Sequence, residues 1–589
     1  MDRDLGETQA MRNPIALLES SSIFRGLDHD TLLAIAAGLD WIALPGGATL
    51  FEAGEAPDAL YLIVGGCLGA YTGDPPQLLA RIPAGETVGE MGLLSGHPRS
   101  ATVRAIRDSD LARLPRETFD RIVVQNPQAL LRISQMLVGR LEEVRGHHDA
   151  RPRPRTYTLV PHAADVDIAA FATEFVAELA TRGRTELVWS GRGAEHTSGW
   201  FHRIESANDF VVYVADPAPT TWTKLCVRQG DALLLVARAA SAPGPWPLGD
   251  GIELPRDTAA RAELVLCHEG PILSGAAARW RAQLPGMPHH HVCGREDIAR
   301  LARSLAGHAV GLVLSGGGAR GFAHIGVVRA LREAGVPIDR VGGTSIGAIM
   351  GAGVAAGWPV AEMIERFRRA FVSTNPLNDY TLPLVSLVAG RKVSRLLRQE
   401  FGDVTIEDLP LPFYAVSANL TTGRGSVHRQ GELWRWLRAS VAIPGVLPPV
   451  FHRGDVHVDG GAINNLPVDV MRAANAGTIV GVDVGADTTF STDLHDHEPP
   501  SLWNLPGWYR HQQRRPGILR ILWRSGMINS DAATAVGRRQ TDLLLHPPLA
   551  HIDLLDWKSF DIAIEAGYRH ANERLAQLDA AALRRLGLA

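Results

Sequence analysis

The chain of 589 residues contains little cysteine and no long apolar run. Its four cysteines, Cys67, Cys226, Cys267 and Cys293, are scattered, and no two of them form a C-x-x-C pair. This spacing argues against a disulfide framework or a thiolate zinc site, and it favours a reducing compartment. No apolar stretch approaches the roughly 20 residues that a membrane-spanning helix needs.

The first residues also lack the basic start and the apolar core of a signal peptide. We therefore expect a cytoplasmic protein, with peripheral contact to the inner face of the membrane as an option. A net charge of −4 and a pI near 6.6 give no reason to expect nucleic acid as a partner. The sequence does not indicate an oligomeric state.

Composition is that of a globular chain, with 46% hydrophobic and 21% charged residues, and the length suggests several domains. Alternating strand and helix patterns predict a multidomain α/β protein. The expected boundaries are a tail at 1–13, a β-roll with flanking helices at 14–145, a linker at 146–155, a small α/β domain at 156–305, a layered α/β domain at 306–485 and its C-terminal extension at 486–589.

A motif of the form G-x-S-x-G stands at Gly343, Thr344, Ser345, Ile346 and Gly347. Apolar residues before it and an apolar run after it predict a strand, a sharp turn and a helix, which is the setting of a nucleophilic serine. The glycines leave room for a strained backbone, and the helix dipole favours negative charge that develops near Ser345. The alternative is a glycine-rich helix start with a capping serine.

A glycine-rich loop precedes this motif, between a buried-strand pattern at 311–314 and a helical pattern at 322–334. Its amides could bind a phosphate or an oxyanion, but no convincing acidic residue follows at the spacing of a dinucleotide site. We therefore predict an oxyanion hole, with the Gly317 and Gly318 amides as the main donors. The loop consists of Gly316, Gly317, Gly318, Ala319, Arg320 and Gly321. Arg320 either orients the loop, meets a phosphate headgroup or forms a structural salt bridge.

A third motif, Asp459, Gly460 and Gly461, follows the strand-like residues 456–458. No histidine stands in a comparable setting, and an aspartate in a partly buried position can deprotonate a serine directly. Ser345 and Asp459 would then form a catalytic dyad of an acyl hydrolase. Taken alone, Asp-Gly-Gly is usually a turn.

The three motifs together give residues 309–475 a specific resemblance to the patatin-like phospholipase family. The sequences at 442–445 and 459–467 are similar to the neuropathy-target-esterase branch of that family. The resemblance implies a patatin-like α/β fold, hydrolysis of acyl esters in phospholipids or lysophospholipids, and catalysis without a metal or other cofactor. The animal relatives carry an N-terminal membrane anchor, and we expect none in this chain.

Two other functions remain open. One is an acyltransferase, which passes the acyl group to an alcohol instead of water. The other is a non-catalytic signalling protein that uses the same fold to bind lipid, although such a protein has no need of all three motifs.

A second ligand site is predicted in the segment 85–102, where a glycine-rich stretch meets a short helix. The backbone amides of this stretch and the guanidinium of Arg99 can bind a phosphate, and Glu90 can accept a hydrogen bond from a ribose hydroxyl. The spacing resembles the phosphate-binding cassette of cyclic-nucleotide-binding domains, which implies cAMP or cGMP as a regulator held by Gly89, Glu90, Arg99 and Ser100. The alternative is an ion pair between Glu90 and Arg99 that only holds the loop. Base contacts would come from a helix at 133–144.

The middle region at 156–305 resembles the Rossmann-like segment of neuropathy-target-esterase relatives. It contains no G-x-x-x-x-G-K-[ST], so no phosphate cradle for nucleotide hydrolysis is visible, and we expect a spacer or coupling domain. Three consecutive histidines at 289–291 are interpreted as a surface run, and no metal is predicted.

Past residue 485, aromatic residues mix with arginines, a pattern that suits either a membrane interface or a lid over an acyl pocket. These residues are Trp503, Trp508, Tyr509, Arg514, Arg515, Trp523 and Arg524. An amphipathic helix is expected at 562–586.

Overall fold

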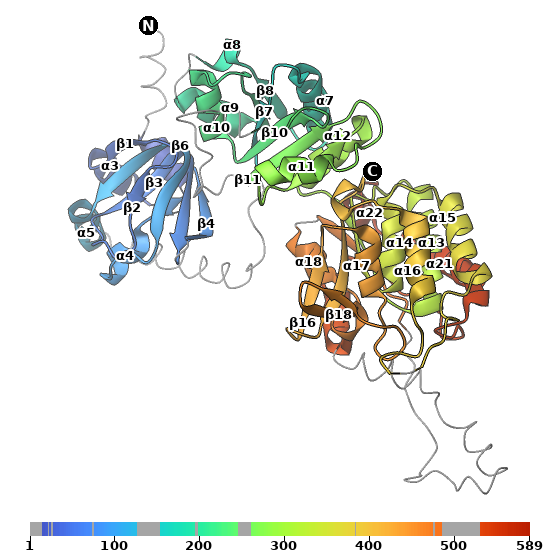
Figure 1. Cartoon of the computed structure of the whole chain (residues 1–589). Helices are drawn as coiled ribbons and strands as arrows, with labels where there is room; N and C mark the ends of the chain where they lie inside the picture. The colour runs from blue at the N-terminus through green and yellow to red at the C-terminus, as the bar shows by residue number, and fades with distance from the viewer. Residues whose placement is uncertain are drawn as a thin grey trace, which may run out of the picture. The chain divides into compact units, whose positions relative to one another are not determined.

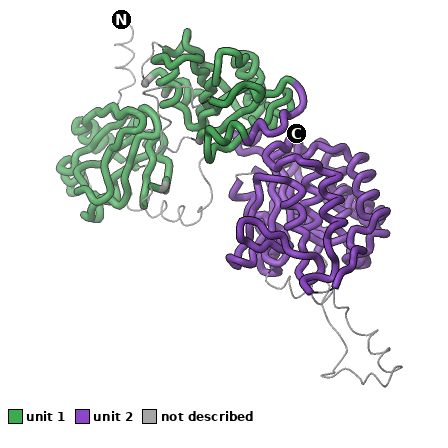
Figure 2. The backbone as a smooth tube through the Cα atoms, in the orientation of Figure 1, with its two compact units in different colours: residues 1–269, 279–302 green, residues 270–278, 303–589 purple. Residues whose placement is uncertain are grey.

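The computed structural model shows two compact units, formed by residues 1–269 with 279–302 and by residues 270–278 with 303–589 (Figures 1 and 2). The structure describes residues 14–21, 23–24, 27–73, 76–125, 154–194, 198–244, 261–382, 384–474, 477–485 and 530–588. The predicted helix at 133–144, most of the linker and the aromatic segment 503–524 lie outside these residues. No helix in the described ranges is both long and apolar enough to cross a bilayer.

The N-terminal part of the first unit is an antiparallel β-roll, as the sequence predicted (Figure 1). Its sheet order is β1-β6-β3-β4, with β2 paired to β6 and β5 paired to β3. The long strand β3 is buried along almost its whole length, and its successive side chains enter two different apolar clusters on its two faces. The strands are β1 (Asp40–Leu44), β2 (Thr49–Phe51), β3 (Ala59–Thr72), β4 (Gln77–Pro83), β5 (Thr87–Val88) and β6 (Thr102–Pro115). The flanking helices are α2 (Pro14–Ser20), α3 (His29–Ala37), α4 (Glu90–Ser95) and α5 (Arg116–Gln125).

The middle part of the chain forms an all-parallel sheet of order β12-β11-β10-β7-β9-β8, with helices in the crossovers. Strands β9 and β10 are almost wholly buried apolar runs, as expected for a parallel sheet covered on both faces. The strands are β7 (Thr156–Pro161), β8 (Thr185–Val188), β9 (Phe210–Val214), β10 (Ala232–Arg238), β11 (Arg261–Cys267) and β12 (His289–Val292). The helices are α7 (Ile168–Ala180), α8 (Ser190–Gly193), α9 (Ser198–Ala207), α10 (Thr221–Gln229), α11 (Ala276–Gln283) and α12 (Arg295–Leu305).

The interpretation of the three histidines as a surface run was wrong. They form the edge strand β12, in which His291 is 4% exposed and shares a 2.9 Å hydrogen bond with His268. His290 meets the buried carboxylate of Glu263. The sequence did not reveal this because three polar residues give no periodic apolar signal of a strand.

Two buried ion pairs join the β-roll to the middle α/β domain within the first unit. Arg107 lies 3.1 Å from Glu205, Arg81 lies 3.2 Å from Asp231, and all four side chains are at most 12% exposed. Breaking one partner of such a pair would leave a buried charge, so the two domains are held as a unit. Arg107 stands on β6, which begins at Thr102, the last residue of the predicted nucleotide cassette.

The second unit is built on an eight-stranded mixed sheet of order β17-β18-β15-β14-β13-β19-β20, with β16 paired to β15. The strands from β15 to β20 in this order are parallel, so their carboxyl ends meet at one edge of the sheet. The strands are β13 (Val310–Leu314), β14 (Arg340–Thr344), β15 (Phe413–Asn419), β16 (Arg424–His428), β17 (Val450–His452), β18 (Asp455–Asp459), β19 (Thr478–Val482) and β20 (Leu543–Leu545).

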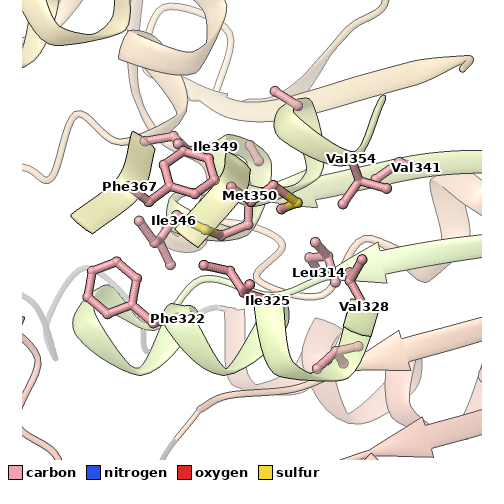
Figure 3. Close-up of a cluster of buried hydrophobic side chains, with 14 of the residues drawn as sticks. Leu314, Phe322, Ile325, Val328, Val341, Ile346, Ile349, Met350, Val354 and Phe367 are labelled. Atoms are coloured by element: carbon pink, nitrogen blue, oxygen red, sulfur yellow. The ribbon is translucent and has the colours of Figure 1, made fainter. Parts of the chain in front are cut away.

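Helices pack on this sheet around a large apolar core. Figure 3 shows part of it, where Phe322 and Ile325 lie near Ile346 and Met350. The main helices are α13 (Ala323–Glu333), α14 (Ile346–Ala355), α15 (Val360–Phe367), α16 (Arg391–Phe401), α17 (Leu433–Ser440), α18 (Val468–Ala473), α21 (Phe560–Ala576) and α22 (Ala580–Arg585). The expected C-terminal helix is therefore two helices, because the capping residue Asp579 begins a new one.

Candidate active site

Ser345 sits at a sharp turn between β14 and α14 at the carboxyl edge of the parallel sheet. Its backbone has φ 54° and ψ −129°, a strained combination for a residue with a side chain. Its side chain makes no capping hydrogen bond to the helix, which counts against the alternative of a simple capping serine. A Cβ at Gly343 or Gly347 would lie 2.8 or 2.3 Å from the Leu314 carbonyl oxygen, so close strand packing requires both glycines.

The hydroxyl of Ser345 donates a 2.7 Å hydrogen bond to Oδ2 of Asp459. The other carboxylate oxygen, Oδ1, accepts a 2.8 Å hydrogen bond from the amide of Gly461. This second bond fixes the carboxylate plane, so Gly461, the second glycine of the motif, helps to orient the carboxylate toward Ser345. Both side chains are nearly covered, since Ser345 is 4% and Asp459 2% exposed.

Burial raises the pKa of Asp459 to about 7, against the opposing effect of the hydrogen bonds from Ser345 and Gly461. A general base works best when its pKa lies near the working pH. Asp459 therefore has both the position and the basicity to accept the serine proton.

The glycine-rich loop lies beside the serine, at the end of β13. The amide of Gly316 donates to the Asn465 carbonyl and that of Ala319 to the Leu554 carbonyl, so these two donors are already engaged. Within the described residues, the amides of Gly317 and Gly318 have no acceptor and remain available to an oxyanion.

The other members of the loop hold it in place. Arg320 Nε donates to the Ile552 carbonyl at 2.7 Å, which fits the loop-orienting role that the sequence allowed. A Cβ at Gly321 would lie 2.4 Å from the Ile346 side chain, so this glycine lets the loop pack against the helix of the serine elbow.

The stretch after Asp459 connects the other two motifs through hydrogen bonds. Thr344 donates through its hydroxyl to the Asn464 carbonyl at 2.8 Å, and Asn465 Nδ2 donates to the Gly316 carbonyl at 3.1 Å. A Cβ at Gly460 would lie 2.2 Å from the Val416 carbonyl oxygen, which explains the first glycine of this motif. Sequence reasoning assigned no role to either asparagine, although both lie in the quoted stretch 459–467.

Ser440 is a positioning residue that sequence reasoning missed. At the end of α17, its hydroxyl accepts a 2.9 Å hydrogen bond from the amide of Ser345 and donates a 2.6 Å bond to the Val416 carbonyl. It thus holds the strained backbone of the elbow against β15. A lone serine at the end of a helix carries no sequence signal for this role.

We expect the Ser440→Ala variant to lose about tenfold in kcat with little change in KM. The substitution leaves the buried Ser345 amide without an acceptor, at a cost of about 1–3 kcal/mol, and loosens the nucleophile. Steady-state kinetics on a soluble ester measures kcat and KM separately. Ser304→Ala, which removes another buried serine hydroxyl of the same unit, is the control. A matching loss in that control would contradict a role specific to Ser440.

Two neutral histidines lie near Asp459, His457 on the same strand β18 and His428 on β16. Ser417 on β15 shares hydrogen bonds of 2.7 Å with His428 and 3.0 Å with His457. Burial lowers the pKa of His428 to about 3 and lowers that of His457. These histidines carry no charge at neutral pH, so they add no positive field that would pull down the pKa of Asp459.

The predicted nucleotide cassette lies in the β-roll, around α4. Gly89 precedes this helix with φ 93°, and Glu90 is buried while Ser100 is exposed. The guanidinium of Arg99 donates to the Gly89 and Ala59 carbonyls and pairs with Asp58 at 3.0 Å. The ion-pair partner of Arg99 is therefore Asp58, which sequence reasoning had not considered. No cluster of three or more metal-ligating side chains is found among the described residues.

Three families match the chain, in the order of its parts. The cyclic nucleotide-binding domain matches residues 41–126, the Neuropathy Target Esterase family P-loop like domain residues 154–306, and the patatin-like phospholipase family residues 312–472. A solved cyclic nucleotide-binding domain from Methylobacillus flagellatus is 24% identical, with a TM-score of 0.22, and covers 24% of this chain and 82% of that chain.

Similar full-length proteins carry related names. "Patatin-like phospholipase domain-containing protein 6" of Homo sapiens is 31% identical over 616 residues, and "Lysophospholipase nte1" of Aspergillus fumigatus is 29% identical over 672 residues. The matches cover 90% and 97% of this chain but only 44% of either relative, so this chain spans less than half of their length.

An "Uncharacterized NTE family protein" of Mycobacterium tuberculosis matches along nearly its whole length. It is 32% identical over 575 residues, which cover 95% of this chain and 96% of that protein. With all three domains matched in the same order, the chain belongs to the neuropathy target esterase (NTE) family of patatin-like proteins.

Proposed function

We propose that this protein is a serine acyl hydrolase that cleaves fatty acyl esters of phospholipids or lysophospholipids. The observation that carries the proposal is the 2.7 Å hydrogen bond from Ser345 to the buried carboxylate of Asp459. A serine on a strained elbow, paired with a base of raised pKa, is the arrangement that nucleophilic catalysis requires. The family matches and the name of the fungal lysophospholipase support the lipid substrate.

The proposed reaction begins with proton transfer. Asp459 Oδ2 accepts the proton of Ser345 Oγ while Oγ forms a bond to the ester carbonyl carbon. The carbonyl oxygen becomes an oxyanion, and the Gly317 and Gly318 amides donate to it. The N-terminus of α14, directly after Ser345, adds a favourable dipole.

Collapse of this intermediate releases the alcohol part of the lipid, which takes the proton from Asp459. Water then attacks the acyl-enzyme, Asp459 accepts a proton from that water, and the fatty acid leaves as Ser345 regains its proton. One carboxylate thus serves both half-reactions, first as base and then as acid.

Fatty acid release from lysophosphatidylcholine tests this proposal, with glycerol added in a parallel reaction. Hydrolysis yields free fatty acid in both reactions. An acyltransferase would instead convert the acyl group into an acylglycerol when glycerol is present. If the folded protein binds lysophosphatidylcholine but releases no acyl group from any of several lipids, neither the hydrolase nor the acyltransferase is supported. The non-catalytic lipid-binding function then takes their place.

The β-roll supports a second proposed function, binding of cAMP or cGMP as a regulator. The family match at 41–126 covers the cassette with Gly89, Glu90, Arg99 and Ser100. Burial raises the pKa of Glu90 to about 7. A ribose hydroxyl donates best to the charged carboxylate, so binding should strengthen from pH 6 to pH 8.

We expect cAMP or cGMP to raise the melting temperature of the full chain, because a ligand that binds only the folded state stabilises it. Glu90→Gln keeps the shape of the side chain but loses the charge, and it should weaken binding at least about tenfold. Calorimetric titration of both nucleotides measures this. The exposed Glu55→Gln, near the same loop, serves as control. Equal affinity for wild type and Glu90→Gln would remove Glu90 from the site.

A further inference from the structure

Four large side chains on the loop before α16 form an exposed apolar patch. Tyr380, Leu382, Leu384 and Val385 are 80%, 79%, 90% and 66% exposed. Single exposed apolar residues are ordinary, but four within six positions are not expected on a surface that meets only water. We refer to these four residues as the apolar patch.

The base of this loop is held in a defined shape. Tyr380 and Val388 form an antiparallel bridge, the Thr381 amide donates to the Leu387 carbonyl at 3.1 Å, and the Ala389 amide donates to the Asp379 carbonyl at 2.8 Å. Val388 is buried at 3% exposure, in contrast to the patch. The base is therefore anchored in the core while the patch is presented outward.

The base of this loop and the amide of Asp459 both bond to the short segment 442–446. The amides of Leu387 and Val388 donate to the carbonyls of Gly445 and Val446, while the amide of Asp459 donates to the carbonyl of Ala442. Three residues of chain span at most about 11 Å, so these two attachment points are close together. The base of the loop that carries the apolar patch thus lies close to the segment that holds Asp459.

Positive charge follows the patch in the sequence. Arg391 and Arg395, in the first turns of α16, are exposed. Lys392 lies between them, with its amide bonded to Asp379, the acidic residue at the base of the loop. Apolar side chains beside exposed cations are the combination that binds an anionic lipid surface, because the cations meet the headgroups and the apolar groups enter the acyl region.

We propose that the apolar patch docks into the surface of a bilayer that contains anionic phospholipid, and so brings the candidate active site to its lipid. This inference rests on the proposed acyl hydrolase function. The membrane is favoured over a protein partner because an enzyme that takes a lipid from a bilayer needs an apolar, cationic surface beside its active site.

Co-flotation of the full chain with vesicles of phosphatidylcholine and phosphatidylglycerol tests docking without any need for catalysis. We expect the double variant Leu382→Ser, Leu384→Ser to bind at least tenfold more weakly than wild type, and to hydrolyse vesicle lipid correspondingly more slowly. Its rate on a soluble short-chain ester should stay within twofold. The matched control is Val536→Ser with Ile562→Ser, two residues of the same unit that are 41% and 56% exposed.

Vesicle binding of the double variant equal to that of wild type would overturn the proposal. It would also be overturned if the substitutions changed the oligomeric state in light scattering, since the patch would then be an interface between copies. Arg391→Glu with Arg395→Glu should weaken binding only when phosphatidylglycerol is present. If wild type hydrolyses neither ester nor lipid but the double variant loses vesicle binding, the docking inference stands and the proposed hydrolase function fails.

Discussion

Ser345→Ala is expected to lower the rate of fatty acid release from lysophosphatidylcholine by at least about a thousandfold. The change removes the only atom that can form the acyl-enzyme, yet it leaves the Gly317 and Gly318 amides and the lipid-binding surroundings in place. The remaining activity should therefore come only from direct attack of water on the bound ester, which ester binding and the two amides still accelerate. Initial rates at saturating lipid measure the effect.

Ser304→Ala is the matched control for this variant, because it removes a buried serine hydroxyl from α12 in the same unit. It should keep nearly full activity. Thermal unfolding should show a cooperative transition for both variants, since neither change opens a cavity larger than one oxygen atom. Ser345→Ala with more than a tenth of wild-type activity would remove Ser345 as the nucleophile.

Asp459→Asn is expected to cause a loss of similar size, because the amide cannot take the serine proton. In wild type the base must be ionised, and burial raises the pKa of Asp459 to about 7. The ratio kcat/KM should therefore be constant above about pH 8 and fall about tenfold per pH unit well below pH 7. A pH–rate profile on a soluble ester measures this fall in kcat/KM at low pH. Activity that stays constant down to pH 5 would contradict the assignment.

The same substitution should stabilise the fold at high pH. The folded-state pKa of Asp459 is raised above its unfolded value, so ionisation costs the folded state stability. This cost is absent below the unfolded pKa near 3.8, grows as pH rises through the range up to about 7, and is constant above it. Asp459→Asn should thus gain at most about 4 kcal/mol over wild type at pH 8, and much less at pH 4.

Denaturant unfolding gives the free energy of unfolding of wild type and Asp459→Asn at pH 8 and pH 4, and so measures the gain at each pH. Asp469→Asn, at an acidic residue on α18 close by in sequence, is the control and should show no comparable gain. An Asp459→Asn variant that is less stable than wild type at pH 8 would mean that the carboxylate holds the fold together, and the interpretation of Asp459 as a strained base would be wrong.

Ser345 and Asp459 could be chosen from the sequence because each lies in a short motif whose local backbone is fixed by its own glycines. Gly343 and Gly347 permit the elbow, and Gly461 aims the carboxylate. The β-roll, the alternating strands and helices of the middle α/β domain and the family were predicted and are confirmed, because buried strands leave apolar runs and the motifs keep their order.

The role of Ser440 could not be predicted in this way. Ser440 reaches Ser345 across 95 positions of sequence, and only the packing of α17 against β15 and the elbow brings the two together. The same holds for Asp58, which pairs with Arg99 from 41 positions away. A single polar residue has no periodicity, so its partner is unknown until the strands are in register.

The apolar patch could not be predicted from the sequence either. Apolar residues alone do not tell whether they lie in the core or on the surface, and only the fold shows that Leu382 and Leu384 are exposed while Val388 is buried. For this protein the sequence alone predicted the proposed chemistry, through a candidate nucleophile, a candidate base and a loop of candidate oxyanion donors in three local motifs. The tertiary structure alone decided which amides stay available, which carboxylate is buried enough to act as a base, and which apolar residues face outward, because each of these depends on contacts between residues far apart in the chain.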